Sequence, residues 1–200
     1  MDKRLLAPLL LLPLSLPALA GTTPSFDCAK AHSSVEQLIC KDAGLAALDN
    51  ELAALYPKAI TNFSPEQAKT EKAMQRGWIK GRNECWKDAD PRKCIESSYQ
   101  MRITELQVKG GQLVVPSPVL YQCGKDLALT AYFYNDGKLP AAVINLGADQ
   151  QVLAYGVPTG SGARYEGQNL SLWTKGKEAL LERYGQPNLS CQQSGKGSNE

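Results

Sequence analysis

Residues 103–123 read ITELQVKGGQLVVPSPVLYQC and contain the point at which the periodicity of the chain changes. Up to Lys109 the apolar residues recur at helical spacing, and the pair Gly110-Gly111 is typical of the end of a helix. After the glycines the apolar residues fall in short runs of the kind that form β-strands. The sequence therefore predicts two domains, a helical domain over residues 21–111 and a β-domain over residues 112–194.

Capping signals for four helices precede the two glycines. The four signals are Ser33 or Ser34 with Glu36, Asp42 or Gly44, Ser64-Pro65 with Gln67, and Asp90-Pro91. The second of these helices has an apolar face at 3-4-3 spacing, made of Leu45, Leu48, Leu52 and Leu55. We expect the third helix to run to about Cys85 and the fourth to end at the glycines. The first domain is therefore expected to be all-α.

Seven apolar runs separated by turn signals follow the glycines. The runs are residues 119–123, 127–134, 141–146, 152–155, 170–173, 179–183 and 189–191. Many short strands at this spacing predict an all-β domain, a small antiparallel barrel or sandwich of about eight strands. In the second run we expect Leu129 and Ala131 to face the core and Tyr134 to lie on the other side. Residues 195–200 are expected to form a disordered tail.

Composition favours a folded protein that is not an enzyme. The 200 residues are 43% hydrophobic and 21% charged, which is typical of globular proteins. The 22 basic and 20 acidic residues give a net charge of only +2, whereas a dedicated nucleic-acid binder normally has a clear excess of basic residues. His32 is the one histidine, so metal sites built on several imidazoles are excluded, and we expect no metal and no cofactor. A hydrolase would have to use His32 as its base, and this residue is distant in sequence from every serine motif.

Residues 1–20 have the pattern of a secretory signal peptide. A short charged start precedes an apolar segment interrupted by prolines, and Ala18-Leu19-Ala20 supplies the small residues of a cleavage site before Gly21. The apolar segment is too short for a membrane-spanning helix. No cysteine lies near the cleavage site, so we expect a periplasmic protein cleaved after Ala20, with no stable membrane anchor.

The six cysteines indicate disulfides, because their number is even, the protein is expected to be exported, and no C-x-x-C motif is present. Two of them lie in the β-domain, so Cys123 and Cys191 must pair if the domain boundary is correct. The helical domain contains Cys28, Cys40, Cys85 and Cys94, which allow three connectivities. We favour the two local pairs, 28 with 40 and 85 with 94.

Two turns of the β-domain carry residues suited to binding. Ser161 lies in a small-sided glycine loop, and Lys175 precedes Gly176 at a tight turn. If a hairpin forms through residues 167–169, both side chains lie at the same open end of it. A hydroxyl beside an ammonium suits an acidic cleft. The alternative is that these are two ordinary solvated turns.

This stretch resembles the signature of the membrane-bound or periplasmic inhibitors of c-type lysozyme. The matching motifs are Ser161-Gly162-Ala163-Arg164-Tyr165, Trp173-x-Lys175-Gly176 with Ala179, Tyr121-x-Cys123 and Cys191, over about residues 112–193. The resemblance implies an antiparallel barrel, closed by one disulfide, whose loop plugs the active-site cleft of c-type lysozyme. It also implies that Ser161 and Lys175 approach the two catalytic carboxylates, with Arg164 and Tyr165 supporting or contacting the enzyme.

The helical half resembles the exported LprI-type domain, which is also associated with lysozyme inhibition. The matching residues, over about 26–107, are Asp27-Cys28, Glu36-x-x-Ile39-Cys40, Leu45-x-x-Leu48-Asp49, Tyr56, Trp78-x-x-x-Arg82-x-x-Cys85, Cys94, Tyr99-x-x-Arg102 and Leu106. Each has a structural interpretation: Trp78 and Tyr99 as core residues, and Asp49, Arg82 and Arg102 in ion pairs or caps. No inhibitory loop can be assigned in this half.

The sequence thus predicts a periplasmic inhibitor of c-type lysozyme. Residues 112–194 contain six basic and six acidic side chains, so long-range attraction to a basic lysozyme would be weak and local contacts would supply most of the binding. The alternative is a non-enzymatic cell-envelope module that binds peptidoglycan fragments or another periplasmic protein. The oligomeric state stays open.

Overall fold

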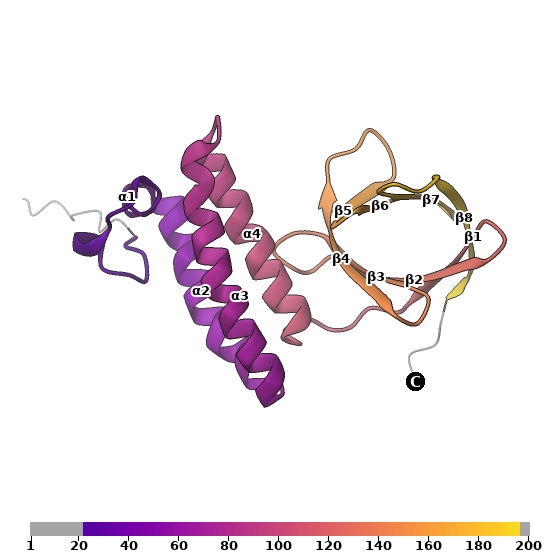
Figure 1. The fold of residues 1–200 in the computed structure, drawn as a ribbon, viewed down its shortest axis with the longest axis horizontal. Coiled ribbons are helices and arrows are strands. Elements are labelled where there is room, and N and C mark those ends of the chain that lie inside the picture. The colour runs from indigo at the N-terminus through magenta and orange to yellow at the C-terminus, as the bar shows by residue number, and fades with distance from the viewer. Residues whose placement is uncertain (1–21, 197–200) are drawn as a thin grey trace, which may run out of the picture.

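The computed structural model describes residues 22–196, in two domains joined by a short connection (Figure 1). The expected signal peptide and residues 197–200 of the expected tail lie outside the described residues. Figure 1 shows an elongated helical bundle beside a ring of strands. No helix within residues 22–196 is both long and apolar enough to cross a membrane.

The first domain contains four α-helices and two 3-10 helices. They are η1 (Cys28–Lys30), α1 (Ser34–Lys41), α2 (Ala43–Thr61), α3 (Pro65–Asn83), η2 (Glu84–Lys87) and α4 (Pro91–Lys109). The helix starts follow the capping signals: Ser33 and Ser64 each form a complete capping box, and the Asp42 and Asp90 side chains accept hydrogen bonds at the starts of α2 and α4. The two local disulfides, Cys28–Cys40 and Cys85–Cys94, are confirmed.

Helix α3 ends two residues earlier than we expected, at Asn83 and not at Cys85. The chain then tightens into the 3-10 turn η2, which includes Cys85. This turn reverses the chain within a few residues, so that Cys85 comes within disulfide distance of Cys94 in α4, with 5.6 Å between their Cα atoms. The constraint from the disulfide therefore explains why the helix does not continue.

The core of the helical domain lies between α1, α2 and α4. Leu45, Leu48 and Leu52 of the expected apolar face of α2 are buried, whereas Leu55 is only partly buried against the same cluster. Their main partners in the cluster are Val35, Ile39, Ile95, Tyr99, Ile103 and Leu106. Burial of these side chains is the main source of stability of the bundle.

The second domain is a closed antiparallel barrel in which each strand pairs with the next and β8 pairs with β1. The strands are β1 (Val119–Cys123), β2 (Leu127–Tyr134), β3 (Ala141–Leu146), β4 (Gln150–Val157), β5 (Ala163–Gly167), β6 (Leu170–Lys175), β7 (Glu178–Arg183) and β8 (Leu189–Lys196). The seven expected runs are all strands, and several are longer than expected. Strand β5 is the eighth. It begins directly after the glycine loop at residues 160–162, and with β6 it forms the hairpin through residues 167–169 that we considered. The Cys123–Cys191 disulfide joins the first strand to the last, as domain parity required.

Strand β8 continues to Lys196 and so includes two residues of the expected tail. Residues 195 and 196 pair with Leu120 and Val119 of β1. Backbone hydrogen bonds to β1 hold this segment, and they need no apolar side chains. The polar sequence of residues 195 and 196 therefore gives no sign of a strand, and it led us to expect a tail.

The β2–β3 loop, residues 135–140, contacts the helical domain, and Figure 1 shows it reaching α4. The backbone N–H of Leu139 donates to Thr104 Oγ1 at 3.0 Å, and that of Lys138 donates to Gln107 Oε1 at 2.8 Å. Lys138 also forms an ion pair with Glu51 of α2, with 2.6 Å between Nζ and Oε2. The two domains are therefore in direct polar contact.

Candidate functional site

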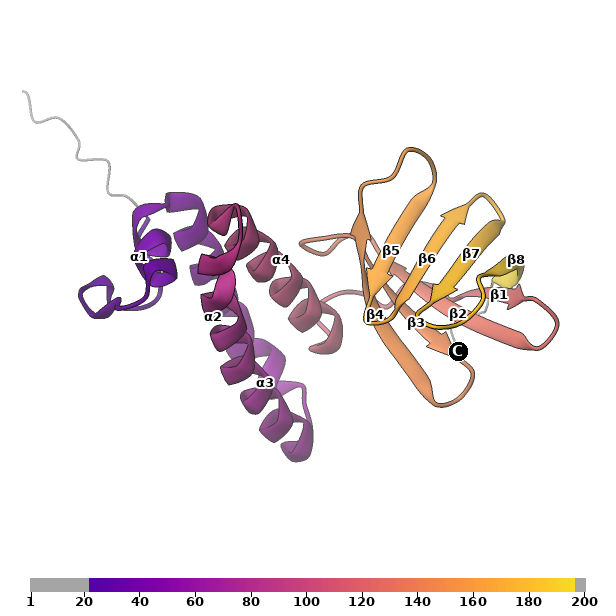
Figure 2. The same cartoon turned by 45° about the horizontal axis from the view of Figure 1, so that its top comes forward.

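The β4–β5 loop (residues 158–162) and the β6–β7 turn (residues 176–177) lie at the same end of the barrel, as Figure 2 shows. This follows from the antiparallel pairing of β5 with β6, which places Ala163 opposite Thr174. Ser161 and Lys175 are both exposed at this end. We call the β4–β5 loop together with Lys175 and the β6–β7 turn the barrel tip.

Gly162 allows the loop to lie directly against β6. Its φ angle is +70°, in the left-handed region, and a Cβ atom there would lie 2.2 Å from the carbonyl oxygen of Thr174. The same Cβ would be 3.3 Å from Cβ of Lys175. Only glycine fits such a position without displacement of the backbone. The close approach fixes where residue 161 lies relative to Lys175.

Trp173 is a second support of the loop, and we assigned it no role from the sequence. Its indole Nε1 donates a hydrogen bond to the carbonyl oxygen of Ser161 at 2.8 Å, and Thr159 Oγ1 donates to the same oxygen at 3.4 Å. The backbone of residue 161 is thus bonded to the loop itself and to β6, while its side chain stays exposed. These two hydrogen bonds restrict the backbone of the loop.

The barrel tip carries Lys175 and Lys177, and Glu178, the cross-strand partner of Lys175, is exposed beside them. Among the residues that the structure describes, no carboxylate lies within ion-pair distance of Lys175 or Lys177. Gly176 between them has a φ of +61°, which gives the tight turn that presents both lysines to solvent. The tip therefore offers a hydroxyl and ammonium groups on a short, rigid edge.

Three residues of the motif point elsewhere. Arg164 forms ion pairs with Glu166 at 3.0 Å and with Glu182 at 2.6 Å, and its hydrogen bond to Glu166 is the main reason why its pKa is raised. Tyr165 is only 6% exposed inside the barrel, 5.2 Å from the ring of Phe133, and burial raises its pKa. Ala163 is half-buried. Arg164 and Tyr165 therefore make contacts within the barrel, and the roles expected for them toward an enzyme stay predictions.

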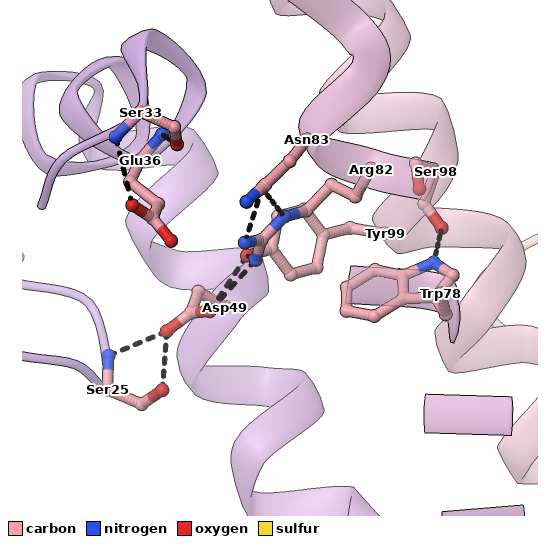
Figure 3. Close-up of polar contacts among 9 residues, drawn as sticks. All are labelled: Ser25, Ser33, Glu36, Asp49, Trp78, Arg82, Asn83, Ser98 and Tyr99. Carbon is pink, nitrogen blue, oxygen red and sulfur yellow. Dashed lines mark hydrogen bonds and ion pairs between the residues drawn. The ribbon is translucent and has the colours of Figure 1, made fainter. Parts of the chain in front are cut away.

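The polar residues that carry the resemblance in the helical half form buried contacts, and Figure 3 shows those around Asp49, Arg82 and Tyr99. Tyr99 OH donates to Asp49 Oδ1 at 2.8 Å and accepts from Arg82 Nη1 at 2.6 Å, and Trp78 packs edge-on against the Tyr99 ring at 5.2 Å. Arg102 forms a second buried ion pair with Glu71. The expected ion pairs of Asp49, Arg82 and Arg102 and the core position of Tyr99 are therefore present, whereas Trp78 is only partly buried.

Residues 22–196 contain no cluster of three or more His, Cys, Asp or Glu side chains that could hold a metal ion. His32 is exposed in the turn before α1, where its backbone N–H donates to Glu36. Fold and site together define a protein with a disulfide-bonded helical domain followed by a closed barrel that presents a rigid polar tip.

Comparison with known proteins identifies both domains. A family model described as "Lysozyme inhibitor LprI" matches residues 28–109, and one described as "Membrane-bound lysozyme-inhibitor of c-type lysozyme" matches residues 121–190. Lipoprotein LprI of Mycobacterium tuberculosis (strain H37Rv) is 35% identical over 162 residues, which is 80% of either chain, and Lipoprotein LprI of Mycobacterium bovis matches equally well. The membrane-bound lysozyme inhibitor of C-type lysozyme from Cupriavidus necator is 38% identical over 63 residues, 32% of this chain and 50% of that protein.

The chain belongs to the LprI family, with an LprI domain followed by a barrel of the membrane-bound lysozyme-inhibitor type. Both resemblances drawn from the sequence are therefore confirmed. The match to the mycobacterial proteins spans 162 residues, so it extends over parts of both domains.

Proposed function

We propose that this protein inhibits c-type lysozyme by placing the barrel tip in the active-site cleft of the enzyme. The observation that carries the proposal is the exposure of Ser161 and Lys175 at one end of the barrel, on a loop held by Gly162 and Trp173. Family membership supports lysozyme as the partner. We further propose that the protein acts by binding alone, without catalysis, and that it works in the periplasm.

The chemistry of the target explains why this pair of groups would inhibit. A glycosidase of this kind uses one protonated and one ionised carboxyl group on either side of the scissile bond. An ammonium beside them favours the ionised form of both, and so lowers the pKa of the general acid and removes its proton. The hydroxyl of Ser161 would donate a hydrogen bond to one carboxylate. The barrel tip would also exclude the sugar chain from the cleft.

Rigidity of the barrel tip compensates for weak long-range attraction. Residues 112–194 of the β-domain carry equal numbers of acidic and basic side chains, so its long-range electrostatic attraction to a basic enzyme is weak. A loop that is already ordered loses little conformational entropy on binding. Most of the binding free energy would then come from contacts within the cleft.

The proposal predicts that the double variant Ser161→Ala/Lys175→Ala loses inhibition. Removing a charged group that is desolvated in a complex costs about 2–5 kcal/mol, so the inhibition constant should rise by about 30-fold or more. The measurement is a stoichiometric titration of c-type lysozyme turnover with the purified protein. The same titration against g-type and i-type enzymes measures class preference.

A matched control lies on α3, in the helical domain. The double variant Thr70→Ala/Lys72→Ala also removes one exposed hydroxyl and one exposed ammonium, and it should inhibit like the unmodified protein. Full inhibition by Ser161→Ala/Lys175→Ala would contradict the proposal and place the inhibitory site in the helical half. Absence of lysozyme inhibition by the unmodified protein would contradict the function itself.

A further inference from the structure

The helical domain contains a cavity of about 330 Å³ that the barrel tip does not involve. It lies between α1, α2, α3 and the segment that precedes α1, and its apolar wall consists of Phe26, Leu52, Tyr56, Trp78 and Ile79. Ile79 is 38% exposed, so the cavity opens to solvent at this side. Glu36, Asp49 and Arg82 supply its charged groups.

Two of the three charged groups neutralise each other. Arg82 and Asp49 are both buried, with 4.0 Å between Nη1 and Oδ1. The Asp49 carboxylate also accepts hydrogen bonds from the Tyr99 hydroxyl at 2.8 Å, from Ser25 N at 2.7 Å and from Ser25 Oγ at 2.6 Å (Figure 3). A buried pair with its hydrogen bonds satisfied is part of the structure and leaves no net charge for a ligand.

Glu36 is different, because all its partners are neutral. Its Oε2 atom accepts hydrogen bonds from the backbone N–H groups of Ser33 and His32, both at 3.2 Å. The bond from Ser33 is the main reason why the pKa of Glu36 lies below its ordinary value, and the Asn83 side chain acts in the same direction. Within residues 22–196 no basic side chain is in ion-pair contact with this carboxylate. Glu36 therefore gives the cavity a net negative charge.

The aromatic wall of the cavity also favours a cation. The faces of Tyr56 and Trp78 are negative, and a cation within about 6 Å of such a ring is attracted to it. The fold already uses this attraction at the floor, where the Arg82 guanidinium lies 5.4 Å from the centres of the Trp78 and Tyr99 rings. Figure 3 shows the Glu36 carboxylate pointing from α1 toward the side where Asp49 and Arg82 lie.

We propose that this cavity binds a lysine or arginine side chain of a polypeptide partner. The aliphatic stem would lie against Leu52 and Ile79, and the charged end would meet the Glu36 carboxylate beside the aromatic rings. A cavity of about 330 Å³ has room for one long side chain and is too small for a folded element. The inference goes beyond lysozyme inhibition, because it assigns a contact to the helical domain whatever the partner is.

The test is an NMR titration of the full chain with blocked amino acids. N-acetyl-lysine-N-methylamide and N-acetyl-arginine-N-methylamide should give saturable shifts of the Trp78 indole N–H signal, while those of Trp86 and Trp173 stay in place. N-acetyl-norleucine-N-methylamide, which has a similar apolar stem without the charge, should bind at least about fivefold more weakly. Equal shifts with the norleucine compound would overturn the proposal, as would no shift with either cation.

Two variants test the charge and the rings separately. Glu36→Gln should weaken binding of the lysine compound about fivefold, and glutamine at this position keeps the capping box of α1, so the fold is retained. Glu66→Gln removes an equivalent charge from the exposed first turn of α3 and should leave binding of the lysine compound unchanged.

Tyr56→Leu tests the aromatic ring. It keeps an apolar side chain and should also weaken binding of the cation. Unchanged binding in Glu36→Gln would contradict the proposal. No lysozyme is present in this experiment, so its result is independent of the proposed function.

Discussion

At the scale of single residues, Trp173 links two segments that are twelve positions apart in sequence. Its side chain lies on the outer face of β6, and its indole N–H reaches back to the carbonyl oxygen of Ser161 at 2.8 Å. The hydrogen bond therefore ties the backbone of the β4–β5 loop to β6. Its loss should free the loop while the barrel stays folded.

We predict that Trp173→Phe weakens lysozyme inhibition about three- to tenfold, because one hydrogen bond contributes about 0.5–1.5 kcal/mol. The midpoint of thermal unfolding should move little, since the ring remains aromatic and half-buried. Inhibition constants from the titration of lysozyme turnover measure the effect. Trp86→Phe alters an indole that is 59% exposed in the helical half, and this control should inhibit normally. An effect of equal size in both variants would contradict the positioning role.

At the scale of elements, the β4–β5 loop depends on one glycine and tolerates change at another. Gly162 has a positive φ and lies against the backbone of β6, whereas a Cβ on Gly160 would meet no atom within 4 Å. The two glycines occupy the same loop but face different constraints. The loop therefore provides its own matched pair of variants.

Gly162→Ala should displace the loop and weaken inhibition by more than about tenfold, because alanine in the left-handed region costs about 1–2 kcal/mol and its Cβ collides with Thr174. Gly160→Ala should leave inhibition unchanged. Enzyme titration together with thermal unfolding separates loss of the loop geometry from loss of the fold. Normal inhibition by Gly162→Ala would show that the geometry of the loop is unimportant.

Elements with local signals were predictable from the sequence, and those that depend on distant partners were not. The helix starts at Ser33 and Ser64 follow from capping residues three positions apart. Strand β5 has the sequence ARYEG, which lacks a continuous apolar run, so the sequence indicated it only as one arm of a hairpin through residues 167–169, and its pairing with β4 and β6 makes it a strand. The exposure of Ser161 and Lys175 at one end could be derived from a hairpin. The hydrogen bond from the Trp173 indole to Ser161 could not be derived, because it depends on the register in which β6 pairs with β5.

At the scale of the whole molecule, the β2–β3 loop determines how the barrel meets the helical domain. Thr104 is fully buried in α4, and its hydroxyl accepts the Leu139 N–H while donating to Gln100 O at 2.8 Å. Tyr134 shows the consequence on the barrel side. It lies on the outer side of β2, as expected, yet it is only 7% exposed, and it lines a cavity together with Glu105 and Val108 of α4.

The double variant Thr104→Val/Lys138→Ala should loosen the contact between the domains without unfolding either. Valine leaves the Leu139 N–H without its acceptor, a loss of about 1 kcal/mol or more, and alanine removes the ion pair to Glu51. Backbone NMR relaxation should give one rotational correlation time for both domains in the unmodified protein and two in the variant. Thr61→Val, at the exposed end of α2, is the control. One shared correlation time in the double variant would show that these contacts do not hold the domains together.

The central claim concerns where the barrel tip lies when lysozyme is bound, and a crystal structure of the complex with c-type lysozyme tests it most directly. The account predicts that Ser161 Oγ and Lys175 Nζ lie within hydrogen-bond distance of the two catalytic carboxylates, with the β4–β5 loop in the conformation described above. A complex in which the cleft is empty, or is filled by the helical domain, would contradict it.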